Sequence, residues 1–276
     1  MVRMNEFDRI LEGYMPFGEN PFKHISGKKV VFFDTETTGF RPASSQITEI
    51  GAIIIDGDNL QEETTFHQMI ELNQDTENSL HAEPKPGQMS VKDILKMTGY
   101  YDQPGGRADE RTAIDSFNNF IPQGSVICAH NAKFDMKMVN SRAKKLGTDP
   151  IRQYSKVLDT MIMNQQFFIP MSQELEMNDE IDINVKQKAA QQLHALSSRW
   201  QETGRGAKYS SRLGDMSKAF TGEVGDWHTA IADVQMTIKI FKELKGFFDQ
   251  HFNSELKYNH DFIRRYKRQL SIQKKR

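Results

Sequence analysis

The sequence has little cysteine and no long apolar run. Cys128 is the single cysteine among 276 residues, which excludes an internal disulfide framework and a zinc site built from several cysteines and agrees with a reducing compartment. No apolar run approaches the roughly 20 residues of a membrane-spanning helix. Residues 1–17 mix charged with apolar side chains, unlike a secretory signal. We therefore expect a cytoplasmic protein with no membrane partner.

An excess of charge of either sign is also missing. Lysine and arginine total 36 and aspartate and glutamate total 37, so the formal net charge is −1. Because dedicated nucleic-acid binders usually carry a basic excess, this total at first disfavours such a partner. The total hides opposed regions: residues 257–276 hold eight basic residues and one acidic residue, a charge of +7, which leaves −8 for residues 1–256.

The basic C-terminal segment has two interpretations. Either it attaches to the phosphate backbone of a nucleic acid without regard to sequence, or it is a solvated terminus. On the first interpretation, the substrate-binding residues include Arg264, Arg265, Lys267 and Arg268.

The chain length fits one large domain with additions. We expect an N-terminal extension at 1–28, a main domain at 29–250 with a polar insertion at about 169–210, and a basic tail at 251–276. Acidic residues gather in the first third of that insertion, at 174–182.

The order of apolar patterns predicts an α/β fold. Strands at 29–34, 47–56 and 64–71 form an antiparallel meander, a polar loop follows at 73–88, and strands at 125–129 and 157–158 alternate with helices. This order favours a mixed sheet, three antiparallel strands and then two parallel, flanked by helices. The helices are expected at about 90–98, 108–121, 132–146, from 160 onward, 185–200 and 229–244.

Two carboxylates lie close together at the end of the first strand. Asp34 and Glu36 are two residues apart, so their side chains project from the same face of the strand. Two like charges at this spacing repel each other, and a shared divalent cation would relieve the repulsion. The alternative is that both residues cap a turn.

Two further carboxylates lie on helix faces that should be buried. Asp135 shares a face with Met138 and Val139, and Asp233 shares a stripe with Met236 and Ile240. Unpaired buried carboxylates are costly, and oxygen donors without soft ligands suit Mg²⁺ or Mn²⁺.

Each of these helix carboxylates also has an ordinary explanation. Asp135 could pair with Arg142 on the same helix face, and Asp233 could be an acid favoured by the helix dipole. Asn131 is the expected N-cap of the helix at 132–146, Asp159 is expected to cap the next helix, and Phe134 is expected in the core.

His228 lies five residues before Asp233, about 140° away on an ideal helix. We expect it in the loop before the helix, where it could reach the metal site. There a neutral imidazole is the natural general base for a water molecule. A lone histidine is more often structural or solvated.

Three segments carry a likeness to one enzyme family. Residues 33–39 (FDTETTG), 129–135 (AHNAKFD) and 228–233 (HTAIAD) resemble, in order, the three motifs of the DEDD-type 3′–5′ exonucleases, the third in its histidine-containing version. Lesser matches lie at 49–52, 97–100 and 158–160. The resemblance covers about 29–168 and 210–245 and implies a ribonuclease H-like fold.

The resemblance also implies roles for individual residues. It implies two divalent cations, Mg²⁺ or Mn²⁺, a base role for His228, and a terminal-nucleotide pocket lined by Thr37 and Thr38. The implied reaction hydrolyses the 3′-terminal phosphodiester and releases nucleoside 5′-monophosphates. The implied metal ligands are Asp34, Glu36, Asp135 and Asp233.

Three functions stay open on the sequence alone. Our first expectation is a DNA exonuclease acting on single-stranded 3′ ends. The second is an exoribonuclease of the same fold. The third is a proofreading or accessory subunit whose partner is a DNA polymerase or another replication protein, with the insertion and the N-terminal extension as candidate docking surfaces.

Overall fold

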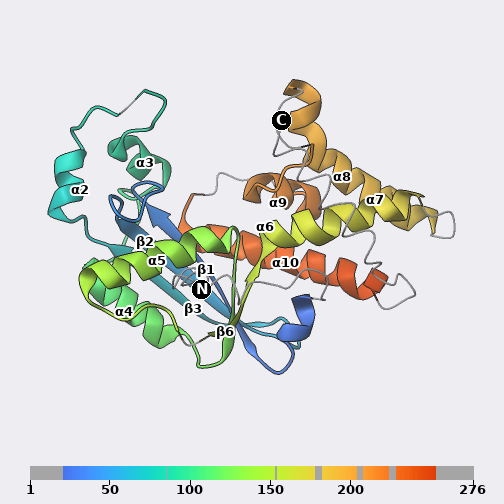
Figure 1. Cartoon of the computed structure of the whole chain (residues 1–276), viewed down its shortest axis with the longest axis horizontal. Helices are drawn as coiled ribbons and strands as arrows, with labels where there is room; N and C mark the ends of the chain where they lie inside the picture. Colours follow the sequence, from blue (N-terminus) through green and yellow to red (C-terminus); the bar gives the residue numbers. More distant parts are fainter. Residues whose placement is uncertain are drawn as a thin grey trace, which may run out of the picture. The chain divides into compact units, whose positions relative to one another are not determined.

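The core of the fold is a mixed sheet (Figure 1) of six strands, in the order β4-β3-β2-β1-β5-β6. Strands β1, β2 and β3 pair antiparallel, whereas the β1–β5, β5–β6 and β3–β4 pairs are parallel. The strands are β1 (Lys29–Thr37), β2 (Ile47–Asp56), β3 (Glu62–Ile70), β4 (Arg107–Ala108), β5 (Ser125–Ala129) and β6 (Tyr154–Asp159). The predicted α/β class and strand directions are confirmed, and β4 is an addition at the edge.

This computed structural model describes residues 21–84, 86–152, 154–177, 182–203, 208–223 and 228–252. The helical elements are η1 (Pro21–His24), α2 (Gln74–Ser79), α3 (Val91–Met97), α4 (Glu110–Phe120), α5 (Ala132–Leu146), α6 (Thr160–Met163), the π-helical turn η2 (Asn164–Phe168), α7 (Ile169–Met177), α8 (Ile183–Thr203), α9 (Leu213–Thr221) and α10 (Ala230–Phe252). Among the described residues, no helix is long and apolar enough to cross a membrane.

The chain divides into two compact units. Of the described residues, 24–159 and 228–238 belong to the first unit, which contains the whole sheet. The second unit contains 21–23, the described residues between 160 and 223, and 239–252. It includes α7 and α8, which occupy much of the predicted polar insertion. The predicted domain boundaries at 28 and 250 stay a prediction.

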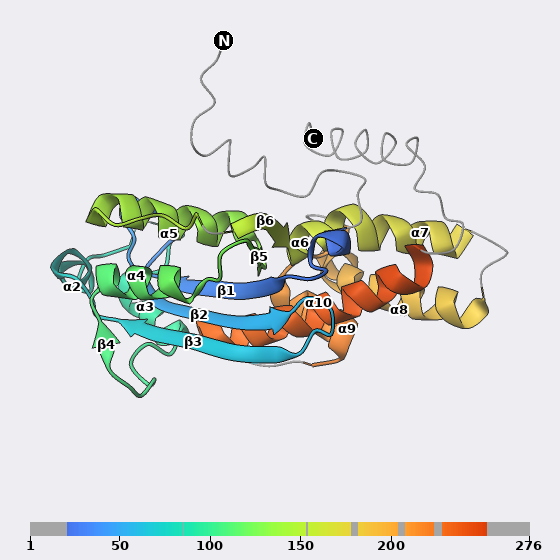
Figure 2. The ribbon, with the colours of Figure 1, turned by 90° about the horizontal axis from the view of Figure 1, so that it is seen from below.

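Two helices cover one face of the central strands in the first unit (Figure 2). Phe33 of β1 and Ile50 of β2 pack with Phe117 of α4 and with Met136 and Val139 of α5 in one buried cluster. Burial of such a side chain contributes about 1.5–3 kcal/mol. Because strand side chains alternate, the residues between these core positions face the opposite side of the sheet.

Local corrections to the sequence prediction have simple causes. The predicted loop at 73–88 contains α2, whose N-cap Asn73 accepts a hydrogen bond from Thr76 N–H. The helix predicted from 108 begins at Glu110, because Asp109 caps it and the two preceding residues join the sheet as β4. In contrast, the helix predicted at about 90–98 is confirmed as α3, whose N-cap Ser90 accepts a hydrogen bond from Asp93 N–H.

The predicted side-chain cap at Asn131 is wrong. Asn131 precedes α5 in the left-handed conformation, with φ of 63°, and its side chain makes no capping hydrogen bond. Instead, its backbone N–H donates to Asp159 Oδ1 at 3.1 Å. Asp159 is buried at the end of β6, so its carboxylate ties two neighbouring strand ends together.

Candidate active site

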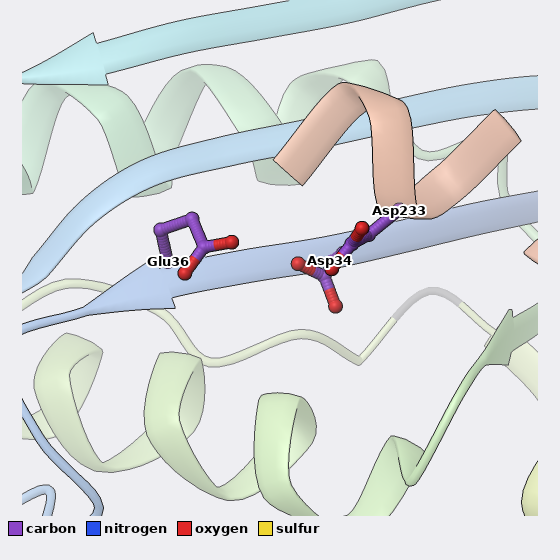
Figure 3. A group of neighbouring side chains, drawn as sticks. All are labelled: Asp34, Glu36 and Asp233. Atoms are coloured by element: carbon purple, nitrogen blue, oxygen red, sulfur yellow. The ribbon is translucent and has the colours of Figure 1, made fainter. Parts of the chain in front are cut away.

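Strand β1 presents two carboxylates next to a third from α10 (Figure 3). Asp34 and Glu36 lie within β1, which leaves the turn-capping alternative without support, and Asp233 lies in the first turn of α10. Each of the three offers one oxygen, and these oxygens all lie within 4.8 Å of one another. The sequence reasoning named all three residues, and the fold brings them together from opposite ends of the chain.

One oxygen of this group has no protein partner. Asp233 Oδ1 is buried and, within the described residues, accepts no hydrogen bond. An unsatisfied buried acceptor of this kind costs about 1–3 kcal/mol, and more when it is charged. The oxygen is therefore in the state expected of a ligand for a cation.

The fourth predicted ligand, Asp135, comes from the first turn of α5 and is only 2% exposed. Its Oδ1 accepts hydrogen bonds from Thr35 N–H at 3.1 Å and Thr35 Oγ1 at 2.7 Å. Arg142, the alternative partner considered for Asp135, instead donates to Glu110. That alternative is therefore wrong, and Asp135 is fixed to β1 beside Asp34.

Burial first, and then the charge of nearby carboxylates, raises the pKa of Asp34, Glu36, Asp135 and Asp233. The pKa of Asp34 lies well above its ordinary value, first because of burial and then because of the charges of Asp135 and Glu36. Burial, followed by the charges of Asp233 and Glu49, raises the pKa of Glu36 to about 8. The ionised cluster therefore lacks a compensating positive charge.

The two helix carboxylates show the same effect. Burial raises the pKa of Asp135 to about 7, opposed by the hydrogen bonds from Thr35. Burial and the charge of Glu49 raise the pKa of Asp233 to about 7. A divalent cation would reverse these shifts, because it favours the ionised form of each ligand.

Glu49 is a member of this region that the search for site residues missed. It stands opposite Glu36 in the β1–β2 register and is 1% exposed. Its carboxylate accepts hydrogen bonds from Ala230 N–H, His67 Nε2 and Gln103 Nε2. A single carboxylate in the apolar run Ile47–Ile55 is the signal that could have found it.

His228 lies where the sequence predicted, in the segment just before α10. Its side chain is exposed, and its backbone has φ of 150°, a conformation that L-residues rarely adopt. His228 lies just before the first turn of α10 and five residues before Asp233.

The two threonines predicted to line a nucleotide pocket are buried at the end of β1. Thr37 Oγ1 donates to Gly39 O, and Thr38 Oγ1 accepts from Gln46 N–H, so both hydroxyls brace the following loop. That loop exposes Phe40, which is 88% exposed and meets Phe134 edge-on at a centroid distance of 6.1 Å. Phe134 itself is half-buried against the core.

The remaining predicted substrate contacts lie in the tail. Arg264, Arg265, Lys267 and Arg268 are outside the described residues, so their role stays a prediction.

The residues of the cluster fit a divalent cation. They offer carboxylate oxygens from β1, α5 and α10, the hard donors that Mg²⁺ and Mn²⁺ prefer. One of these oxygens is buried without a partner, and three of the residues are close enough to share an ion.

Comparison with known proteins places this chain in a wider group. A family model described as exonuclease (RNase_T) matches residues 31–188. DNA polymerase III subunit epsilon of Treponema pallidum is 30% identical over 137 residues, covering 49% of this chain and 55% of that protein. DNA polymerase III PolC-type of Caldanaerobacter subterraneus subsp. tengcongensis is 29% identical over 165 residues, covering 57% of this chain and 10% of that protein. The chain thus spans about half of one curated relative and a tenth of the other.

Solved structures with a similar fold include E. coli exonuclease I. Its complex with a dT13 oligonucleotide superposes with a TM-score of 0.54 at 18% identity, covering 82% of this chain and 43% of that one. The zinc-bound form of the E. coli complex with single-stranded DNA gives a TM-score of 0.52 at 18% identity, with 82% and 42% covered. At this identity, the likeness concerns the fold.

Proposed function

The chain belongs to the exonuclease family whose model matches residues 31–188, and from this premise we propose that it is a metal-dependent 3′–5′ exonuclease of the histidine-containing DEDD subclass. Its substrate is the single-stranded 3′ end of DNA, and its products are nucleoside 5′-monophosphates. The observation that carries the proposal is the carboxylate cluster, with three oxygens within 4.8 Å of one another.

The cluster would hold two divalent cations, Mg²⁺ or Mn²⁺. When bound, such ions neutralise the scissile phosphate and lower the pKa of a water molecule. The buried Oδ1 of Asp233 and the oxygens of Asp34 and Glu36 supply the shared donors, and Thr35 fixes Asp135 for the same task.

His228 supplies the proton acceptor in this proposal. Its ring takes a proton from the attacking water, and its exposed position before α10 leaves it accessible from solvent. The side chain therefore handles the proton, while the carboxylates would hold the cations that neutralise the phosphate.

The terminal nucleotide has candidate contacts on the loop after β1. Thr37 and Thr38 brace this loop, which places the exposed ring of Phe40 beside Phe134. An exposed aromatic ring can stack on a base of any sequence. In the tail, Arg264, Arg265, Lys267 and Arg268 would add sequence-independent phosphate contacts.

A second candidate function is proofreading in association with a DNA polymerase. The curated relatives favour it, because they carry the names DNA polymerase III subunit epsilon and PolC-type. The preference for DNA draws on these names and on the oligonucleotide complexes of E. coli exonuclease I.

The decisive experiment uses purified protein and end-labelled substrates. Single-stranded DNA, duplex DNA and RNA, each labelled at the 5′ end, are incubated with Mg²⁺, Mn²⁺ or chelator. We expect a ladder of shortened 5′-labelled single-stranded DNA with either cation and none with chelator. Immediate release of the 5′ label would contradict the direction, and faster digestion of RNA would replace DNA as substrate. Co-purification with a polymerase tests the proofreading alternative.

The variant His228→Ala tests the base. His228→Ala should lower kcat by about 10²-fold or more while KM changes little, because the proton acceptor acts in the chemical step. An unchanged pH–rate profile between about pH 6 and 8 in this variant would remove the base role.

A further inference from the structure

The carboxylate of Glu49 lies beside the proposed metal ligands, yet protein donors occupy both of its oxygens. Oε1 accepts from Ala230 N–H at 3.0 Å and from His67 Nε2 at 2.9 Å, and Oε2 accepts from Gln103 Nε2 at 2.9 Å. This bonding distinguishes it from Asp233, which has a buried oxygen that accepts no hydrogen bond from any described residue. Glu49 is therefore arranged to hold protein groups.

The protein group that Glu49 holds is the first residue of α10. The first N–H groups of a helix have no partner within the helix, and a carboxylate at this end is also favoured by the helix dipole. Glu49 belongs to the central strand β2, so it fixes the start of α10 to the sheet.

The next residue on the same face of β2 brings the helix closer still. A Cβ atom added to Gly51 would lie 2.7 Å from the carbonyl carbon of Ala230 and 2.7 Å from Ile231 N. Real Cβ contacts are essentially never this short, so only glycine permits the observed approach of α10. We call Glu49 and Gly51 together the β2 support.

The held residue lies between the two side chains that the proposed reaction needs, His228 just before α10 and Asp233 in its first turn. Ala230 follows His228 by two residues and precedes Asp233 by three, which is less than one helical turn. A shift of the first turn would therefore move Asp233 away from Asp34 and Glu36 and would change the orientation of His228.

We propose that Glu49 is a positioning residue which, with Gly51, places Asp233 and His228 against the β1 carboxylates. The expected effect on catalysis rests on the proposed function, whereas the expected effect on cation binding does not. His67 and Gln103 support Glu49 in this role, because their hydrogen bonds fix the orientation of its carboxylate.

Two substitutions at position 49 separate the hydrogen bond from the charge. Glu49→Ala removes the acceptor for Ala230 N–H. Glu49→Gln removes the charge but keeps an oxygen for Ala230, and Gln103 can rotate its amide to accept from the new NH₂ group. If Glu49→Ala does not fold, Glu49→Asp, which is one methylene too short, takes its place.

Gly51→Ala and Glu110→Gln complete the set. Gly51→Ala displaces α10 by steric contact without removing any polar group. Glu110 is a second buried glutamate, 6% exposed, that accepts hydrogen bonds from Arg142 and from Ile47 N–H and, within the described residues, forms no hydrogen bond or ion pair with α10. Glu110→Gln is therefore the control for general loss of stability.

The experiment measures Mn²⁺ affinity, hydrogen exchange of the Ala230 amide, and kcat and KM on single-stranded DNA. For Glu49→Ala and Gly51→Ala we expect Mn²⁺ affinity and kcat to fall by about 10–100-fold, with faster exchange at Ala230. Glu49→Gln should stay within about threefold of wild type. Glu110→Gln should lower the melting temperature without changing Mn²⁺ affinity.

Three outcomes would overturn the inference. They are unchanged Mn²⁺ affinity and exchange in Glu49→Ala, equal damage in Glu49→Gln, or an equal loss of Mn²⁺ affinity in Glu110→Gln. If wild-type protein binds Mn²⁺ but digests no nucleic acid, the proposed function fails, and the affinity and exchange measurements still decide the role of Glu49.

Discussion

The Glu110 carboxylate and the carboxylate cluster of Asp34, Glu36 and Asp233, both in the first unit, have opposite environments. Glu110 of α4 receives hydrogen bonds from Arg142 Nε at 2.7 Å and Ile47 N–H at 3.0 Å, and it forms a second contact with Arg142 Nη2. Asp34, Glu36 and Asp233 face one another, and within the described part of the chain no lysine or arginine forms an ion pair with them.

The difference shows what each group can do. The Glu110 carboxylate has a permanent positive partner in Arg142, so it joins α4 to α5 and needs no cation to balance its charge. In the cluster, no such partner among the described residues offsets the cost of removing the charged carboxylates from water, as the raised pKa values of Glu36 and Asp233 indicate. The ion pair of Glu110 with Arg142 is therefore suited to a structural role. The carboxylate cluster, with which no described lysine or arginine forms an ion pair, is suited to binding an exchangeable cation.

The largest expected effect separates activity from stability at Asp34. Asp34→Asn removes one ligand charge but keeps the shape of the side chain, so nuclease activity in Mg²⁺ should fall by about 10³-fold or more. The melting temperature without cation should hold or rise, because one of several repelling charges is gone. Digestion assays and thermal unfolding of the same preparation measure both. Wild-type digestion by this variant would contradict the metal assignment.

The next largest effect is the reverse at the Glu110–Arg142 ion pair, where stability should fall while cation binding is unchanged. Glu110→Gln leaves the buried Arg142 charge uncompensated, so the free energy of unfolding should fall by about 3–5 kcal/mol. Urea unfolding measures the loss, and Mn²⁺ affinity should not change.

A double substitution sharpens this result. Glu110→Leu with Arg142→Met removes both charges, and apolar side chains of similar volume often restore most of the stability. If Glu110→Gln were as stable as wild type, the pair would not be the structural counterpart of the cluster.

The sequence located the cluster because local periodicity and order were sufficient. Asp34 and Glu36 share a strand face, and Asp135 and Asp233 lie on helix stripes expected to be buried, so all four residues were candidates before any tertiary contact was known. The mixed sheet followed from the same patterns, and β1 to β3, β5 and β6 are where the sequence placed them within a few residues.

Other features depended on contacts that are distant along the chain. Glu49 bonds Ala230, which is 181 residues away, so its task could not be read from the neighbouring isoleucines. Asn131 resembles a capping residue, but a tertiary hydrogen bond to Asp159 engages its N–H instead. Strand β4 has two residues, too few for any period to appear.

The smallest expected effect is a pH dependence that only the cluster should show. Without cation, the pKa values of about 8 for Glu36 and about 7 for Asp233 lie above their ordinary values of 4.5 and 3.8. The folded protein therefore keeps protons that the unfolded chain releases, so this region's contribution to stability falls as pH rises from about 4 to 8. Cation binding must displace the same protons. As pH rises, stability without cation should therefore fall, whereas cation affinity should rise.

Mn²⁺ affinity should accordingly rise between pH 6 and 8, by about tenfold per pH unit for each proton displaced. Titrations at pH 6, 7 and 8, paired with melting curves with and without Mn²⁺, measure both signs, and the cation should stabilise most at pH 8. Glu110→Gln should keep the wild-type slope, whereas Glu36→Gln should flatten it. Equal affinity at pH 6 and 8 in wild type would mean that the carboxylates are already ionised, and the contrast with the Glu110–Arg142 pair would then lose its electrostatic basis.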